Sequence, residues 1–128
     1  MATTELTGTT FESTITSNDI VLVDFWAEWC GPCRAFGPVY ETVSEKNDDI
    51  VFGKVDTEAE QGLSSAAGIT SIPTLMAFRD GILLFSQAGA LPAPALEDLI
   101  GQIRGLDMDE IRKTLDEAEA AEAAAAKA

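Results

Sequence analysis

Short apolar runs alternate along the chain with amphipathic stretches, and the runs predict β-strands. The strongest run, Ile20–Trp26, is β-branched and aromatic except at Asp24, and it predicts a central strand covered on both faces. Four further strands are predicted at Thr4–Leu6, 50–56, Thr74–Arg79 and Ile82–Ala88. The dipeptide Asp80-Gly81 between the last two runs is typical of a hairpin turn.

The amphipathic stretches between the strands predict helices. The first helix is predicted to begin near Thr9, and three further helices are predicted over residues 32–46, 58–67 and 94–104. Strands that alternate with helices and end in a hairpin predict an α/β fold, with a mixed sheet between layers of helices.

Composition divides the chain near Gly105. We expect one domain over residues 1–105, followed by an acidic, Ala/Glu-rich helical extension over 106–128. The extension has only a thin apolar stripe, which includes Ile111 and Leu115. Two readings of it stay open: a solvated, partly frayed helix, or a helix that docks on the body or on a partner.

Charge narrows the classes of partner. The 128 residues include 22 acidic and 8 basic side chains, a net charge of −14, which argues against binding to nucleic acid or to an anionic membrane. The chain has no histidine, so His-based catalysis and His metal ligation are excluded. No apolar run approaches the roughly 20 residues of a membrane span, and the first residues do not resemble a secretory signal, so we expect a cytoplasmic protein.

The only two cysteines, Cys30 and Cys33, lie where the strongest predicted strand meets a helix. Cys30 comes just before the helix, where free N–H groups and the helix dipole favour a thiolate. Cys33 lies one turn further on and should be more enclosed. We therefore predict that Cys30 attacks a partner's disulfide and that Cys33 then resolves the mixed disulfide.

Three other uses of the cysteine pair remain open. Two thiols fill only half of a zinc shell, so a zinc site needs a second chain, and an iron–sulfur cluster has the same limit. We expect no metal site. A purely structural disulfide is the third reading, although it would close too short a loop to constrain the unfolded chain much.

Asp24 interrupts the apolar strand, on the same face as Leu22 and Trp26. If it is buried, its pKa rises, which would suit it to exchange a proton with Cys33 through water. The alternative is an aspartate at a strand end that reaches solvent. Lys54, on the expected neighbouring strand, either pairs with Asp24 or extends to solvent.

Several residues near the cysteines have less specific patterns. The Ile72-Pro73 bond is of the only type with an appreciable cis population, but from these residues alone a trans, strand-initiating proline is favoured. Trp26 and Trp29 are expected to pack around the cysteines. Gly89 marks either a bulge or a close approach of backbone.

The segment Val23–Arg34, with Trp-Cys-Gly-Pro-Cys at its centre, resembles the signature of thioredoxins. The similarity covers about residues 4–104 and continues through Pro38, Lys54-Val55-Asp56, Gly68-Ile69, Ile72-Pro73-Thr74, Phe78, Asp80-Gly81 and Gly89-Ala90. It implies the thioredoxin fold, a central five-stranded mixed β-sheet with helices on both faces. The extension after Gly105 departs from the family, as does Arg34, which stands where lysine is usual.

The resemblance also implies residue roles. Cys30 would be the exposed nucleophile and Cys33 the resolving thiol, with Asp24 as the family's buried acid and Lys54 beside it. Pro73 would be a cis-proline facing the cysteines, and the backbone beside it would pair with the target like an added strand. The docking groove would be lined by Trp29, Gly31, Pro32, Ile72, Gly89 and Ala90.

The implied activity is protein-disulfide reduction. No cofactor would be bound beyond the redox-active Cys30–Cys33 disulfide, and electrons would come from NADPH through the flavoprotein thioredoxin reductase. Other partners would be disulfide-containing proteins, and we expect a monomer. A disulfide oxidase or isomerase is an alternative, against which the Gly31-Pro32 dipeptide argues. A binding or scaffold module is another, which the extension leaves open.

Overall fold

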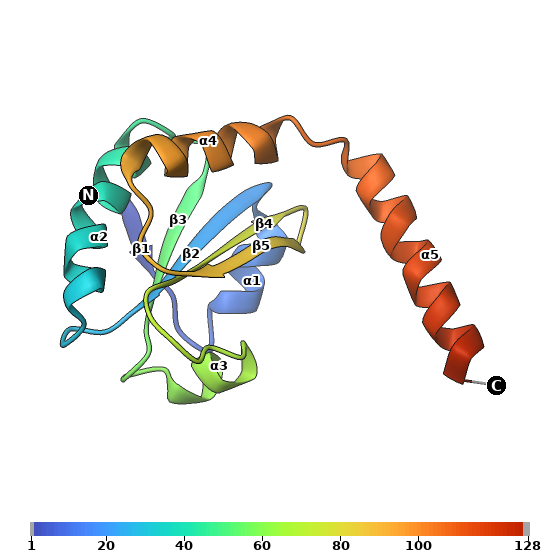
Figure 1. Ribbon diagram of the computed structural model, residues 1–128, viewed down its shortest axis with the longest axis horizontal. Helices are drawn as coiled ribbons and strands as arrows, with labels where there is room; N and C mark the ends of the chain where they lie inside the picture. The colour runs from blue at the N-terminus through green and yellow to red at the C-terminus, as the bar shows by residue number, and fades with distance from the viewer. Residues whose placement is uncertain (1, 127–128) are drawn as a thin grey trace.

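The computed structural model describes residues 2–126, and its centre is a five-stranded sheet in the order β1-β3-β2-β4-β5 (Figure 1). The strands are β1 (Thr3–Glu5), β2 (Ile20–Trp26), β3 (Val51–Asp56), β4 (Thr74–Arg79) and β5 (Ile82–Ala88). β1, β3 and β2 are parallel, whereas β4 and β5 are antiparallel to their neighbours. The predicted mixed sheet is confirmed.

The helices form a layer on each face of the sheet. They are α1 (Phe11–Ser17), α2 (Gly31–Glu45), α3 (Gln61–Ala66), α4 (Ala93–Arg104) and α5 (Met108–Ala126). Side chains of α2 and α4 pack on one face, and those of α1 and α3 pack on the other. Helix α5 extends away from this body (Figure 1).

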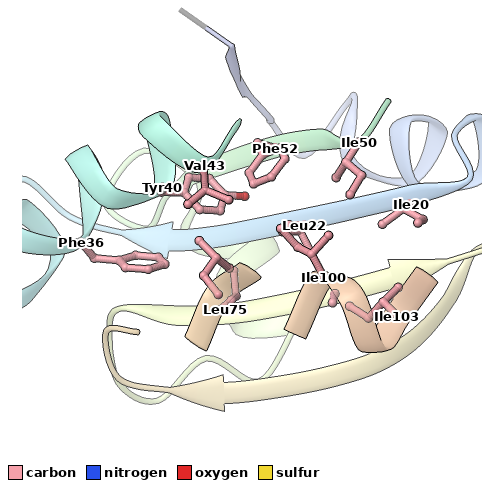
Figure 2. Packing of buried hydrophobic residues seen from close by; sticks show 12 residues of the cluster. Ile20, Leu22, Phe36, Tyr40, Val43, Ile50, Phe52, Leu75, Ile100 and Ile103 are labelled. Atoms are coloured by element: carbon pink, nitrogen blue, oxygen red, sulfur yellow. The ribbon is translucent and has the colours of Figure 1, made fainter. Parts of the chain in front are cut away.

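Strand β2 is central because its side chains supply both layers of the core. Ile20 and Leu22 point toward α2 and α4, and Val21, Val23 and Phe25 point toward α1 and α3. Figure 2 shows Leu22 among Tyr40, Leu75 and Ile100 in the first of these clusters. A strand covered on both faces is held rigidly, so the residues at its end have a fixed position.

Most element boundaries differ from the predictions by one or two residues, and the largest difference is at α3. β1 begins one residue earlier than expected. The predicted helix over 58–67 shortens to Gln61–Ala66, because the carboxylate of Asp56 accepts the backbone N–H groups of Glu58 and Ala59 and holds a turn there.

Helix α5 touches the body only near its start. Met108 is buried and Ile111 is half-buried, and the remaining residues from Arg112 to Ala126 are exposed. Arg112 donates to Asp80 in the β4–β5 turn at 2.9 Å. The base of the extension therefore docks on the body while most of it is solvated. None of the helices described here is long and apolar enough to cross a membrane.

Candidate active site

The cysteine pair lies where β2 passes into α2, at the end of the central strand. Cys30 is the N-cap of α2, Cys33 lies in the first turn, and the two form a disulfide with Cα atoms 5.2 Å apart. The N–H of Cys33 donates to the sulfur of Cys30 at 3.2 Å. Pro32 lacks only an N–H that would be free in a first turn. On reduction, this N–H and the helix dipole favour a thiolate at Cys30.

The two cysteines are equally enclosed in the disulfide form. Each is 4% exposed, so the expected contrast between an exposed Cys30 and an enclosed Cys33 is not seen. Ala27, Trp26 and Ile72 pack around them. The difference between the sulfurs lies in their position, because Cys30 caps the helix and accepts an N–H whereas Cys33 is part of the helix.

Asp24 is buried within β2, the strand that leads to this site, with 1% of its surface exposed, so the alternative of a solvent-reaching aspartate is wrong. Neither carboxylate oxygen has a hydrogen-bond partner in the structure. Burial raises the pKa of Asp24 from 3.8 to about 7, and the positive charge of Lys54 opposes part of that rise. Asp24 can therefore gain or lose a proton near neutral pH.

Lys54 lies opposite Asp24 in the register of β3 against β2, as predicted. Its ammonium does not hydrogen-bond the carboxylate, whose oxygens are unpartnered, but lies 4.8 Å from the ring centroid of Trp26. Lys54 thus interacts with Asp24 through its charge and with Trp26 through a direct contact.

The loop before β4 brings Pro73 to the cysteines. The Ile72-Pro73 bond is cis, which agrees with the family resemblance and not with the trans bond favoured by the residues alone. The carbonyl oxygen of Ile72 lies 3.8 Å from the Cys30 sulfur. Gly89, with a φ of +108°, donates its N–H to the Pro73 carbonyl at 2.8 Å and holds the end of β5 against this loop.

Trp29 is 66% exposed, so the expectation that it packs around the cysteines is wrong, while Trp26 does pack there. The indole N–H of Trp29 donates to Glu58 at 2.8 Å. Sequence reasoning missed Glu58. Trp26 and Asp56 are register partners at the ends of parallel strands, so residues that follow the two ends come together, and this could have indicated the contact.

The other predicted docking residues lie around the disulfide, but the groove next to Trp29 and Ile72 includes few of them. Gly31 and Pro32 are exposed at the start of α2, and Ala90 is exposed after β5. A groove of about 580 Å³ beside the disulfide is lined by Trp29 and Ile72 among the predicted residues, and otherwise by residues of α3 and its flanking loops.

A disulfide at a helix N-terminus is suited to exchange two electrons with another thiol pair, and the strand before it carries a buried carboxyl group whose pKa is about 7. Within residues 2–126, no three His, Cys, Asp or Glu side chains are grouped to hold a metal ion. The fold and the site define the class as a dithiol–disulfide redox protein.

Comparisons with known proteins define the family. The thioredoxin family profile matches residues 2–102. The chain is 60% identical to a putative thioredoxin 2 of Streptomyces coelicolor, over 93% of this chain and 89% of the relative. It is 38% identical to a thioredoxin of Bacillus subtilis over 80% of this chain and 98% of that one. The chain belongs to the thioredoxin family.

Solved structures support the same assignment. A mutant thioredoxin from Halobacterium salinarum superposes with a TM-score of 0.74 at 38% identity, covering 80% of this chain and 91% of that chain. A Plasmodium falciparum thioredoxin gives a TM-score of 0.71 at 37% identity, covering 77% and 96%. The protein is therefore a thiol–disulfide oxidoreductase, a disulfide reductase of the thioredoxin type whose redox group is its own cysteine pair.

Proposed function

We propose that Cys30 is the attacking and Cys33 the resolving thiol in the reduction of target disulfides. The Cys30 thiolate attacks one target sulfur, and the second target sulfur leaves as a thiolate and takes up a proton. The Cys33 thiolate then attacks the Cys30 sulfur and releases the first target sulfur, which is also protonated. Two electrons pass to the target, and Cys30–Cys33 becomes the disulfide. The observation that carries this order is the Cys33 N–H donated to the Cys30 sulfur.

Asp24 serves in this proposal as the proton acceptor for Cys33. Its pKa of about 7 suits a group that takes a proton when Cys33 must become a thiolate and returns it later. The transfer would pass through water. Lys54 adjusts the reaction by favouring the ionised carboxylate.

Targets would dock on the residues that surround the disulfide. Backbone next to Pro73 would pair with the target chain as an added strand. The remaining contacts would come from Trp29, Gly31, Pro32, Ile72, Gly89 and Ala90. The nearness of the Ile72 carbonyl to the Cys30 sulfur, 3.8 Å, supports this placement.

Thioredoxin reductase, a flavoprotein using NADPH, would restore the dithiol. We place the protein in the cytoplasm as a monomer whose redox domain is residues 1–105, with 106–128 as an added helical segment. Its net charge of −14 disfavours nucleic acid and anionic membranes as partners. An additional binding role is favoured by one observation, the exposure of most of α5.

Substitution of each cysteine tests the proposed order. Cys30→Ser should lose protein-disulfide reduction because the attacking sulfur is gone. Cys33→Ser should still attack but accumulate a mixed disulfide with the target, visible by mass spectrometry and reversed by dithiothreitol. Near-wild-type turnover by Cys30→Ser, or trapping by Cys30→Ser instead of Cys33→Ser, would contradict the assignment. Circular dichroism of both variants checks that the fold is intact.

A further inference from the structure

The groove of about 580 Å³ beside the disulfide has no charged side chain in its lining. Trp29 and Ile72 form its border with the redox site, and Ile69 is its other apolar residue. The rest of the lining carries hydroxyl or amide groups and consists of Thr57, Gln61, Ser64, Ser65, Thr70 and Ser71. The chain has 22 acidic residues, yet none of them lines this groove next to the redox site.

Part of the polar capacity of the groove is already used within the protein. Ser64 donates its hydroxyl to the carbonyl of Glu60 at 2.8 Å, and Thr57 donates to the carbonyl of Trp26 at 3.0 Å. The side-chain amide of Gln61 donates an N–H to the backbone carbonyl of Glu58 at 3.2 Å. These three side chains therefore have less to offer a charged group that enters the groove.

A second groove, of about 590 Å³, lies on the other side of Trp29 and differs in character. Its lining includes Glu28, Arg34, Asp56 and Glu58 in addition to Trp29. The hydrogen bond from the Trp29 indole to Glu58 fixes the indole as the wall between the two grooves. The two sides of the redox site thus present different electrostatic environments to a bound chain.

The uncharged groove is continuous with the redox site. Trp29 precedes Cys30 in the chain, and the carbonyl of Ile72 lies 3.8 Å from the Cys30 sulfur. We propose that this groove binds the residue on one side of the attacked cysteine in the target, and that it selects targets whose residue there is uncharged. This inference rests on the proposed reductase function and adds its substrate preference.

The physical basis is desolvation without compensation. A charged side chain that enters the groove loses water and finds no opposite charge in the lining. A carboxylate is further disfavoured by the net charge of −14. The groove would therefore select targets by rejecting charged side chains. We expect the rate of disulfide reduction to be about five- to tenfold lower when the residue beside the attacked cysteine is charged.

Symmetric peptide disulfides measure this preference directly. Dimers of Ala-X-Cys-Ala and of Ala-Cys-X-Ala place X on one known side of either sulfur that is attacked, with X as Ala, Leu, Gln, Lys or Glu. The second-order rate of reduction by the prereduced full-length protein is divided by the rate with dithiothreitol, which removes the effect of X on the leaving thiol. We expect Leu and Gln to match Ala within about twofold and Glu to be slowest, on one side of the cysteine only.

Variants at Ser65 separate the groove from general charge effects. Ser65 is exposed on α3 and lines the groove, so Ser65→Lys should raise the rate for the Glu peptide at least about fivefold, and Ser65→Glu should do the same for the Lys peptide. Thr114→Lys is the matched control, because it makes the same change in net charge on the exposed, distant helix α5 (Figure 1).

The outcomes separate this inference from the proposed function. Normalised rates that do not depend on X, or equal effects of Ser65→Lys and Thr114→Lys, would overturn the selective groove while leaving the reductase intact. Failure to reduce even the all-alanine disulfide would overturn the proposed function together with the inference. A one-sided preference for uncharged X that Ser65→Lys alone relaxes for Glu would establish both.

Discussion

At the residue scale, Asp24 is a carboxylic acid whose ionised form is disfavoured by burial in the folded protein. Its carboxylate is 1% exposed, has no hydrogen-bond partner, and has a pKa of about 7 against 3.8 for the free side chain. Such a carboxylate reduces stability whenever it is ionised, because the unfolded chain hydrates the charge and the folded chain does not. Stability therefore does not explain why this buried position holds an aspartate.

Asp24 also predicts how stability depends on pH. Because its folded pKa is raised, the unfolded chain loses this proton near pH 4 and the folded chain near pH 7. The Asp24 contribution to the free energy of unfolding is then highest below pH 4, falls as pH rises to 7, and is constant above. Asp24→Asn should remove this fall and stabilise the protein at pH 8 by up to about 4 kcal/mol, as measured by urea unfolding.

The matched control is Asp48→Asn, which changes the same charge at an exposed position. It should leave the difference in stability between pH 5 and pH 8 as in the wild type. Asp24→Asn should also slow the release of mixed disulfides, since it removes the proton acceptor that we propose for Cys33. Equal pH profiles for Asp24→Asn and the wild type would mean that the carboxylate is not desolvated as the structure places it.

Single residues of the site were predictable to different degrees. Three residues were identifiable from the sequence alone. Asp24 interrupts a strongly apolar strand, and Cys30 and Cys33 are the two cysteines of the chain, at the junction of that strand with a helix. The exposure of Trp29 and its bond to Glu58 were not predicted, since they depend on how two strand ends are placed side by side. The cis bond before Pro73 followed only from the family resemblance.

At the element scale, close packing at β3 is set by a glycine. A Cβ at Gly53 would collide with Leu6 Cδ1 and lie 3.3 Å from the backbone oxygen of Leu22. The carbonyl of Gly53 also accepts the buried hydroxyl of Tyr40 at 2.8 Å, which ties α2 to β3 next to Lys54. The elements that carry the cysteines and the lysine are thus held together at this point.

Two glycine-to-alanine substitutions test whether close packing requires Gly53. They should change the free energy of unfolding in opposite directions. Gly53→Ala should destabilise the protein by about 1–3 kcal/mol, because its methyl group has no space. Gly101→Ala lies within α4, where no atom beyond the local helix backbone and the neighbouring residues is within 4 Å of the new Cβ, and it should stabilise the protein by up to about 1 kcal/mol. Thermal or urea unfolding measures both. A neutral Gly53→Ala would show that Leu6 moves aside at no cost.

The elements themselves were largely predictable from pattern. The β-branched runs predicted β2, β4 and β5 correctly, because buried strands leave an apolar signal in sequence. Helix α3 was predicted too long, since its start depends on the Asp56 side chain rather than on periodicity. Short elements of this kind are decided by single hydrogen bonds.

At the scale of the whole molecule, the chain consists of a body, formed by the sheet and helices α1–α4, and of helix α5, which extends from that body. Helix α5 is anchored by buried Met108, and Arg79 donates to the carbonyls of Ile103 and Leu106 at 2.8 and 3.1 Å just before it. The thin apolar stripe left open whether this helix is solvated or docks, and it could not show which part of the stripe docks. The alignment with the Streptomyces coelicolor relative spans 119 residues and so includes part of α5.

Removal of residues 106–128 tests the division into body and extension. Because α5 is anchored mainly through Met108, the truncated chain should fold, lose about 2–5 kcal/mol of stability, and reduce disulfides within about twofold of the full chain. Met108→Ala in the full chain should cost a similar amount if that anchor dominates. A truncated chain that folds but no longer reduces disulfides would place α5 in the function of the site.

We propose that Cys30 and Cys33 act as a dithiol donor to protein disulfides. The most direct test is the equilibrium reduction potential of the pair, measured against glutathione or dithiothreitol by the fluorescence of Trp26 and Trp29. Thioredoxins have potentials of about −270 mV, whereas a strong disulfide oxidant is near about −120 mV. A value close to the first is the result we predict. A value close to the second, or no redox transition at all, would show that the pair is not a dithiol donor to protein disulfides.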